Sequence, residues 1–305
     1  MNWQESFIAW CKQRGIRSLL QEPLASFSWI GIGGAADIVV FPHVDHIPEM
    51  LARLSSASIP YFCIGKGSNV LISDAGFRGV IIVSDQMNYF EVDSEQFCIT
   101  AECGASLQQI VHLAAENGLA GMEGLAGIPG TIAGAVSGNA GSFGVEIADV
   151  VDRVAVTLSD GSTSLLSAAE LHFSYRFAQI PDGAMITKVY LTLQKSDALH
   201  LRRQVWQVRA EKRMHQPIAA RSLGCVFKNP PGESAGRLIE MAGCKGMQEG
   251  GIVVSPLHAN FFINAGRGTA EEYLRLLKIV QERVQIMFGV LLEPEIRFLG
   301  QWGTY

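Results

Sequence analysis

The stretch GMEGLAGIPGTIAGAVSGNAGSFG, residues 121–144, is the most informative part of the sequence. Eight of its 24 residues are glycine, and each glycine lies three or four positions from the next. Apolar residues such as Leu125 and Ile132 stand between them, a pattern that a disordered linker does not need. Glycine at this spacing leaves a face without side chains, where a ligand or another backbone lies close. Pro129 followed by Thr131 predicts a helix start, whose N–H groups suit a phosphate. Tight packing of a helix on a sheet is the alternative.

Two further glycine tracts precede this one. GKGSN, residues 65–69, follows a predicted strand, and its small residues can expose several backbone N–H groups to one anion. Ser68 and Asn69 add side-chain donors, although an ordinary turn is the alternative. GIGGAA, residues 31–36, fits the dinucleotide fingerprint G-x-G-x-x-A, but it runs into the strand-like DIVVF. That fingerprint requires a helix after the turn, so this tract argues against a Rossmann domain.

Composition excludes several classes of protein. The 305 residues are 48% apolar and 17% charged with a net charge of −5, so there is no basic footprint for nucleic acid. No apolar run reaches the ~20 residues of a membrane span, and the N-terminus, with its acidic Glu5, does not resemble a signal peptide. The six cysteines form no CxxC pair, so neither a metal site nor a disulfide framework is expected, and a cytoplasmic location is predicted.

Hydrophobic periodicity and turn residues predict an α+β protein with seams near residues 85 and 200. A helix is expected at the N-terminus, and a glycine turn leads into a strand within 28–42. The pattern that follows predicts helices at 44–56, 106–118, 197–214, 234–242 and 270–288, and strands at 61–65, 78–85, 89–93, 97–102, 153–163, 184–194, 252–254, 259–264 and 290–299. Asp160-Gly161 is a hairpin signal within the strand region 153–163.

Eight motifs occur in order along the chain, and together they resemble the UDP-N-acetylenolpyruvoylglucosamine reductase family. They are IGIGGAAD, IGKGSNVLISDAGFRGVII, GLAGIPGTIAGAVSGNAGSFGVEI, FSYR, GCVFKNP, AGRLIEMAGCKG, SPLHANFFIN and LEPEIRFLG. The resemblance runs from about residue 20 to residue 300. With no insertion between FSYR and GCVFKNP, the chain is similar to the shorter, second structural type of the family.

The resemblance implies non-covalent FAD in a fold of the vanillyl-alcohol-oxidase/PCMH type. It implies FAD-binding subdomains at 1–85 and 86–200 and a substrate-binding domain at 201–305. The flavin contacts that it implies are Gly65, Lys66, Gly67, Ser68, Asn69, Gly127, Ile128, Pro129, Gly130, Thr131, Gly134, Gly138 and Asn139. NADPH and UDP-N-acetylglucosamine enolpyruvate are the implied substrates, UDP-N-acetylmuramate for peptidoglycan and cell wall synthesis is the implied product, and no protein partner is implied.

In the implied reaction, reduced flavin gives hydride to C3 of the enolpyruvyl group, and negative charge develops on C2 and its carboxylate. Arg176 in FSYR matches the family's arginine, and a guanidinium can hold a carboxylate with two parallel hydrogen bonds. Glu295 matches the family's glutamate, with expected roles in polarising the carboxylate or orienting its partners. Glu293, two residues away, competes with it, because residues two apart in a strand share a face.

Cys225 lies where many family members carry the serine that protonates C2. A thiol, with an ordinary pKa of about 8.5, is more acidic than an alcohol and can serve as general acid. A buried inert cysteine, with water supplying the proton, is the alternative. The sequence predicts that Cys225 lies between a glycine and a following strand. The implied substrate contacts are Tyr175, Lys228, Asn229, His258 and Asn260, while Arg213 and His215 match only loosely.

The sequence is also compatible with other functions. A flavin oxidase of the same fold would use oxygen, and a non-catalytic relative would bind flavin or nucleotide sugar only. A thiol redox centre at Cys225 lacks a partner cysteine nearby in the sequence.

Overall fold

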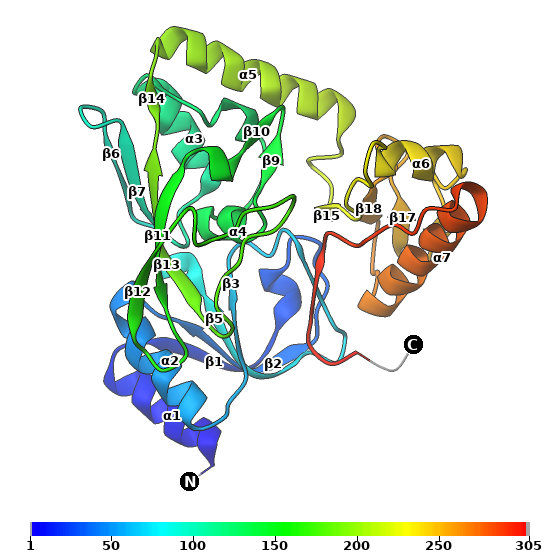
Figure 1. Cartoon of the computed structure of the whole chain (residues 1–305). Helices are drawn as coiled ribbons and strands as arrows, with labels where there is room; N and C mark the ends of the chain where they lie inside the picture. The colour runs from blue at the N-terminus through cyan, green and yellow to red at the C-terminus, as the bar shows by residue number, and fades with distance from the viewer. Residues whose placement is uncertain (1, 303–305) are drawn as a thin grey trace. The chain divides into compact units, whose positions relative to one another are not determined.

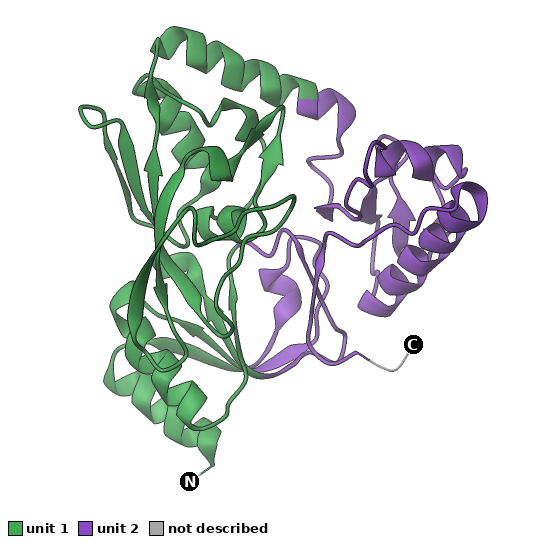
Figure 2. Cartoon of the chain, viewed as in Figure 1, with its two compact units in different colours: residues 1–20, 38–65, 79–211 green, residues 21–37, 66–78, 212–305 purple. Residues whose placement is uncertain are grey.

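The computed structural model describes residues 2–302, and the chain forms two compact units (Figures 1 and 2). Unit 1 consists of residues 1–20, 38–65 and 79–211, and unit 2 of residues 21–37, 66–78 and 212–305. Both units are therefore assembled from three separate segments. The predicted α+β class is confirmed, whereas the predicted division at residues 85 and 200 stays a prediction.

A five-stranded antiparallel sheet, with strand order β12-β11-β13-β7-β6, forms the centre of unit 1. Its strands are β6 (Phe90–Asp93), β7 (Cys98–Glu102), β11 (Val151–Thr157), β12 (Thr163–Ser167) and β13 (Met185–Thr192). Helices α3 (Leu107–Glu116) and α4 (Ile132–Ser137) contribute apolar side chains to the same core. The predicted hairpin is confirmed, since Thr157 pairs with Thr163 across the Asp160-Gly161 turn.

A second sheet has the order β1-β2-β5-β3. Its strands are β1 (Arg17–Pro23), β2 (Ala35–Phe41), β3 (Tyr61–Ile64) and β5 (Phe77–Val83). Within unit 1, β3 and β5 pair in parallel, and α1 (Trp3–Gln13) and α2 (Ile47–Ser56) share an apolar core with them. The sequence did not predict β1, because this edge strand is largely exposed and lacks regular alternation of apolar residues.

Unit 2 contains a four-stranded sheet with order β15-β18-β17-β16. Its strands are β15 (Ser222–Cys225), β16 (Gln248–Glu249), β17 (Ile252–Val254) and β18 (Phe261–Asn264), and its helices are α6 (Ala235–Met241) and α7 (Ala270–Phe288). Thr269 and Glu272 form a capping box at the start of α7, and Gly289 ends the helix in a left-handed conformation. These local signals explain why the predicted bounds of α7 are confirmed.

The predicted strand 290–299 is wrong over most of its length. Only β19 (Arg297–Leu299) is a strand, and it pairs in parallel with β4 (Val70–Ile72). Pro294 lies within the predicted strand, and a proline cannot donate a ladder hydrogen bond. The β-bridge described for residues 290–296 is an isolated one, between Pro294 and Phe227.

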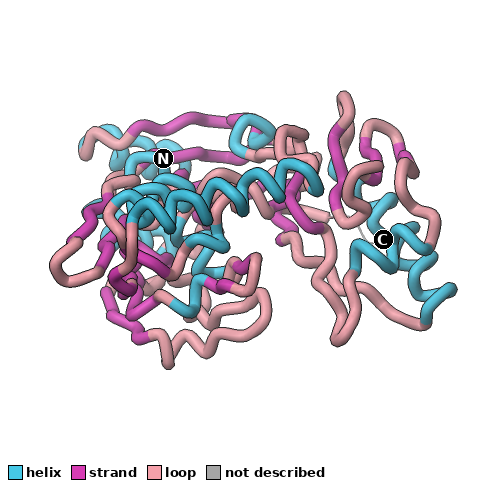
Figure 3. The backbone as a smooth tube through the Cα atoms, turned by 90° about the horizontal axis from the view of Figure 1, so that it is seen from above, coloured by secondary structure: helices cyan, strands magenta, loops and turns pink. Residues whose placement is uncertain are grey.

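Helix α5 (Ala198–His215) is continuous (Figures 1 and 3). The remaining elements are the strands β8 (Leu119–Ala120), β9 (Gly141–Ser142), β10 (Val145–Glu146) and β14 (Gln194–Lys195), and the 3-10 helices η1 (Leu24–Phe27), η2 (Val44–His46), η3 (Ser84–Gln86), η4 (Glu123–Leu125) and η5 (Ile147–Asp149). Within residues 2–302, no helix combines the length and the apolar character that crossing a membrane requires.

Candidate active site

The long glycine tract contains the predicted helix start. Thr131 is the N-cap of α4, and its side chain accepts a hydrogen bond from the Gly134 N–H at 3.3 Å. A Cβ atom added at Gly134 would meet only Thr131 Oγ1 at 3.4 Å, and one added at Gly138 would meet only Gly134 O at 3.6 Å. Both contacts are with α4 or its own cap. One side of α4 is therefore a bare surface that leaves room for a flat ligand.

Two glycine tracts meet inside unit 1. A Cβ atom added at Gly65, just after β3, would lie 2.7 Å from Thr131 Oγ1 and 2.8 Å from Thr131 Cγ2. A Cβ atom essentially never comes this close to a non-bonded atom, so Gly65 is required for this close approach. The end of β3 and the start of α4, 66 positions apart in the chain, are thereby brought into contact.

Gln108 holds the loop before α4, and sequence reasoning missed it. Its Nε2 donates to Ile128 O at 2.7 Å and to Leu125 O at 3.3 Å, and its Oε1 accepts from Gly127 N at 2.7 Å. The Gln108 side chain thus provides hydrogen bonds to residues 125–128, which are not paired with a strand. A glutamine in the first turn of a predicted helix carries no signal of this role, because its partners lie 17 to 20 residues away.

The GKGSN turn divides between the units, with Gly65 in unit 1 and residues 66–69 in unit 2. Within unit 2, a Cβ atom at Gly67 would overlap the backbone of Phe27, so this glycine is explained by packing. Asn69 Nδ2 donates to Glu295 O at 3.3 Å, while its Oδ1 is buried with no hydrogen-bond partner among the described residues. A buried amide oxygen without a partner is costly, which favours a ligand donor at this position.

Each unit, taken by itself, has a feature that suits part of a flavin dinucleotide: the bare side of α4 in unit 1 and the unpaired oxygen of Asn69 in unit 2. The bare side of α4 has room for a flat group, and Asn69 Oδ1 can accept a hydrogen bond from a polar group of a ligand. Among residues 2–302, there is no group of three histidine, cysteine, aspartate or glutamate side chains placed to hold a metal ion.

Arg176 is held against the end of the glycine tract. Its Nη2 donates to Gly141 O at 2.8 Å and its Nη1 to Asn139 O at 3.3 Å, and its guanidinium carbon lies 5.0 Å from the centre of the Tyr175 ring. Tyr175 and Arg176 form the tip of a tight turn in which Ser174 and Phe177 exchange two backbone hydrogen bonds. Arg176 has φ +57°, which costs a residue with a Cβ about 1–2 kcal/mol.

Asn139 ties this turn to the glycine tract. Its side chain is buried, and its Nδ2 donates to Ser174 O at 3.0 Å and to Glu146 Oε2 at 2.8 Å. A Cβ atom added at Gly141 would lie 2.9 Å from Glu146 Cγ, 3.1 Å from Val145 O and 3.2 Å from Arg176 Nη1, so this glycine allows the close approach of all three, the guanidinium included. Arg176, Asn139 and Gly141 therefore form one preorganised cationic group within unit 1.

Cys225 and Glu295 form the corresponding group within unit 2. Cys225 is the last residue of β15 and is half-buried, so the expectation of a strand following it is wrong. The next residue, Val226, accepts a hydrogen bond from Glu295 N at 2.8 Å. Glu295 therefore lies beside the chain that leaves Cys225, although it is 70 positions further along the sequence.

The two competing glutamates, Glu293 and Glu295, differ in burial and in their partners. Lys228 Nζ lies 2.6 Å from Glu293 Oε1, and the Glu293 side chain is 68% exposed. Glu295 is half-buried. The ion pair thus engages the exposed Glu293 carboxylate, which favours Glu295 as the functional residue.

Lys212 and Tyr273 lie near Cys225, and sequence reasoning missed both. Lys212 is only 4% exposed, and burial lowers its pKa to about 8, with the nearby Cys225 acting in the opposite direction. The Tyr273 side chain is fully buried, and its hydroxyl has no hydrogen-bond partner in the described part of the chain. Burial raises the pKa of Tyr273, and Cys225 raises it further. The sequence did contain a signal that Lys212 is buried: it follows Leu201 and Val205 at helical spacing, on an otherwise apolar face of the predicted helix.

Several predicted substrate contacts also have structural roles. The Asn260 side chain is 2% exposed and bonds to both the N–H and the C=O of Phe227, which favours a role in joining two segments. Asn229 Oδ1 accepts from Ala235 N at the start of α6. His258 Nδ1 accepts from Asn260 N at 3.3 Å, and burial, together with the charge of Lys245, lowers its pKa.

The loosely matched Arg213 and His215 are exposed, as is Tyr175.

The chain is similar to known proteins over nearly its full length. A family model described as the C-terminal domain of UDP-N-acetylenolpyruvoylglucosamine reductase matches residues 216–299, and a model described as an FAD binding domain matches residues 24–167. The UDP-N-acetylenolpyruvoylglucosamine reductase of Caldicellulosiruptor bescii is 38% identical over 302 residues, which cover 98% of this chain and 96% of that protein. The protein of the same name from Streptococcus pneumoniae is 38% identical over 289 residues, covering 94% and 95%.

A solved structure shows the same similarity. The crystal structure of UDP-N-acetylenolpyruvylglucosamine reductase from Thermus caldophilus has a TM-score of 0.79 and 34% sequence identity to this chain. The similarity covers 93% of this chain and 98% of that one.

Proposed function

The chain belongs to the UDP-N-acetylenolpyruvoylglucosamine reductase family, and we propose that it reduces UDP-N-acetylglucosamine enolpyruvate to UDP-N-acetylmuramate for peptidoglycan synthesis. The observation that carries this proposal is the anchored guanidinium of Arg176, which is held by the Gly141 and Asn139 carbonyls at the end of the glycine tract. Such a fixed cation suits a substrate whose carboxylate gains negative charge during reaction.

FAD is the proposed cofactor, and NADPH the proposed reductant. When bound, FAD would supply the hydride-transfer chemistry between NADPH and the enolpyruvyl double bond. The bare side of α4, at Gly134 and Gly138, would lie against the flavin, and the loop held by Gln108 would border it. Asn69 Oδ1 would accept a hydrogen bond from the cofactor. The other proposed flavin contacts are Gly65, Lys66, Gly67, Ser68, Gly127, Ile128, Pro129, Gly130, Thr131 and Asn139.

Arg176 stabilises the charge that develops on the substrate carboxylate. Its positive charge cannot be lost at physiological pH, and its orientation is set before the substrate arrives, because two backbone carbonyls hold it. A preorganised cation needs no reorganisation as charge develops, so its interaction strengthens in the transition state.

Cys225 donates the proton to C2 of the substrate, and its thiol becomes a thiolate. The nearby Lys212 side chain, when protonated, stabilises that thiolate. It can then donate its own proton to regenerate the thiol. Glu295, whose backbone bonds to Val226, orients the substrate carboxylate or its partners. Lys228, Asn229, His258, Asn260 and Tyr175 stay proposed substrate contacts, with the structural roles of Asn229 and Asn260 noted above.

An anaerobic two-step titration tests the function. Stoichiometric NADPH is expected to bleach the flavin absorption band of the purified protein, and UDP-N-acetylglucosamine enolpyruvate is then expected to restore it rapidly. Reduction without restoration by this substrate, but with rapid restoration by oxygen, would identify an oxidase instead. Protein that neither retains flavin nor reacts with NADPH would contradict the proposal altogether.

A further inference from the structure

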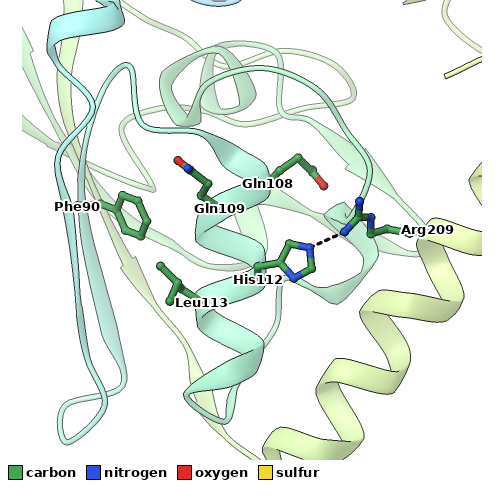
Figure 4. Close-up of a pocket in the computed structure, with 6 residues that line it drawn as sticks. All are labelled: Phe90, Gln108, Gln109, His112, Leu113 and Arg209. Atoms are coloured by element: carbon green, nitrogen blue, oxygen red, sulfur yellow. Dashed lines mark hydrogen bonds between the residues drawn. The ribbon is translucent and has the colours of Figure 1, made fainter. Parts of the chain in front are cut away.

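Unit 1 contains a cavity that none of the proposed flavin or substrate residues lines. It has a volume of about 330 Å³ and is formed by α3, β6 and α5 (Figure 4). Its walls consist of Phe90, Gln108, Gln109, His112, Leu113 and Arg209. This volume is at the lower end of the range for small-molecule sites.

One end of the cavity carries an unneutralised positive charge. Arg209 Nη1 lies 2.6 Å from His112 Nε2 (Figure 4). A guanidinium has only donors, so His112 Nε2 is the acceptor in this contact and adds no negative charge. In residues 2–302, no ion pair involves Arg209. Arg209 is half-buried, so its charge is only partly hydrated. This end of the cavity is therefore suited to an anion.

The other end of the cavity is apolar. Phe90 projects from β6 and Leu113 from α3, on the side away from Arg209 (Figure 4). A ligand that satisfies both ends has one carboxylate and a compact apolar body, with the carboxylate on the guanidinium and the body between Phe90 and Leu113. Arginine suits a planar carboxylate because two parallel hydrogen bonds can form.

The cavity is physically connected to the loop of the proposed flavin site. Gln108 lines the cavity, and its amide also bonds to Ile128 O, Leu125 O and Gly127 N. A ligand that moves the Gln108 side chain must change the three hydrogen bonds that hold residues 125–128. Binding at the cavity and retention of the flavin would therefore be coupled, and such coupling is reciprocal.

We propose that this cavity is a regulatory site for a small aryl or alkyl carboxylate, held by Arg209 and coupled through Gln108 to the loop 125–128. The binding itself does not depend on the proposed function, whereas the coupling rests on the proposed flavin site.

Binding is tested on the flavin-loaded protein with 3-phenylpropionate and its neutral amide. Calorimetry is expected to show binding of the acid at least 10-fold tighter than that of the amide. Arg209→Gln should weaken binding of the acid at least 10-fold, whereas Arg203→Gln, an exposed position on the same helix, should not change it. Equal binding of acid and amide, no binding, or an unchanged affinity in a folded Arg209→Gln variant would each overturn the proposal.

Coupling is tested by the rate at which flavin leaves the loaded protein. The acid is expected to change this rate at least 5-fold in the wild-type protein and in Arg203→Gln, but not in Arg209→Gln. Binding without any change in flavin release would overturn the regulatory role. A protein that binds the acid but does not reduce UDP-N-acetylglucosamine enolpyruvate would separate this proposal from the proposed function.

Discussion

At the scale of single residues, Cys225 separates two hypotheses, because a general acid and an inert buried cysteine predict different effects of substitution on the rate. It ends β15 half-buried, with Lys212 and Tyr273 nearby, so its surroundings are not those of an inert core cysteine. If its thiol is the general acid, Cys225→Ala should slow reoxidation of the reduced flavin by substrate about 10²–10⁴-fold. Cys225→Ser should keep most of the rate, because the serine hydroxyl also carries a proton that it can donate to C2.

The same two variants provide the control. Reduction of the flavin by NADPH does not require the thiol, so this half-reaction should be unchanged in both. Rapid-mixing absorbance measures the two half-reactions separately. An alanine variant that reoxidises as fast as the wild type would show that water supplies the proton.

Lys212 makes a second prediction at this scale, about stability and pH. Its pKa is about 8 in the folded protein against 10.5 ordinarily, because burial disfavours the charged form. The unfolded chain therefore binds more protons than the folded one between pH 8 and 10.5, and stability rises with pH across this window. The full penalty, about 3 kcal/mol, is present below pH 8.

Lys212→Met removes this penalty, so the variant should be more stable than the wild type at pH 7 by up to about 3 kcal/mol. The gain should shrink as the pH approaches 10.5. Urea unfolding at pH 7 and pH 10 measures it, and Lys195→Met, at an exposed lysine, is the matched control. A Lys212→Met variant that is less stable at both pH values would mean that the buried ammonium is fully compensated.

At the scale of elements, the contact between the end of β3 and the start of α4 brings Gly65 next to Thr131 of the long glycine tract. Gly65→Ala would force its Cβ to within 2.7 Å of Thr131 Oγ1, so the two elements must separate. We expect this variant to lose flavin on gel filtration and to unfold at lower urea concentration. Gly266→Ala, where an added Cβ meets nothing within 4 Å, should behave as the wild type.

A compensating change sharpens the test. Thr131→Gly in the Gly65→Ala background removes both atoms that clash, at the cost of a helix cap, about 1 kcal/mol or less. Flavin retention should be partly restored in the double variant. If the double variant retains no more flavin than Gly65→Ala alone, the contact between Gly65 and Thr131 does not position the start of α4 for flavin binding.

Elements also show where sequence patterns are reliable. Helix α7 was predicted at its observed bounds, because its cap residues and apolar spacing are local features. The segment 290–299 was predicted as one strand, yet only Arg297–Leu299 is paired, because its partner β4 lies more than 200 residues away and no local pattern specifies it.

At the scale of the whole molecule, unit 2 depends on segments from the first quarter of the chain. β19 pairs with β4, and the Asp74 carboxylate accepts from the N–H groups of Ala270 and Glu271 at the start of α7. Ile30, Ile32 and Leu71 belong to the same buried core as α7. The predicted domain 201–305 lacks all of these residues.

A fragment of residues 201–305 should therefore not fold cooperatively by itself. Urea unfolding followed by near-ultraviolet circular dichroism should show no sigmoidal transition for the fragment, while the full chain shows one. A cooperative transition in the fragment would support the predicted boundary near residue 200 and contradict the dependence on β4.

By itself, the sequence determined the α+β class, the family and the flavin cofactor. These were predictable because glycine spacing, helix caps and ordered motifs are local features of the chain. Tertiary structure decided the rest. It pairs Lys228 with Glu293, which supports the proposed role of Glu295, buries Lys212 and Tyr273 near Cys225, and places the Gln108 amide against the loop 125–128. Each of these depends on residues far apart in the chain, whose proximity, and hence whose burial and charge interactions, exists only after folding.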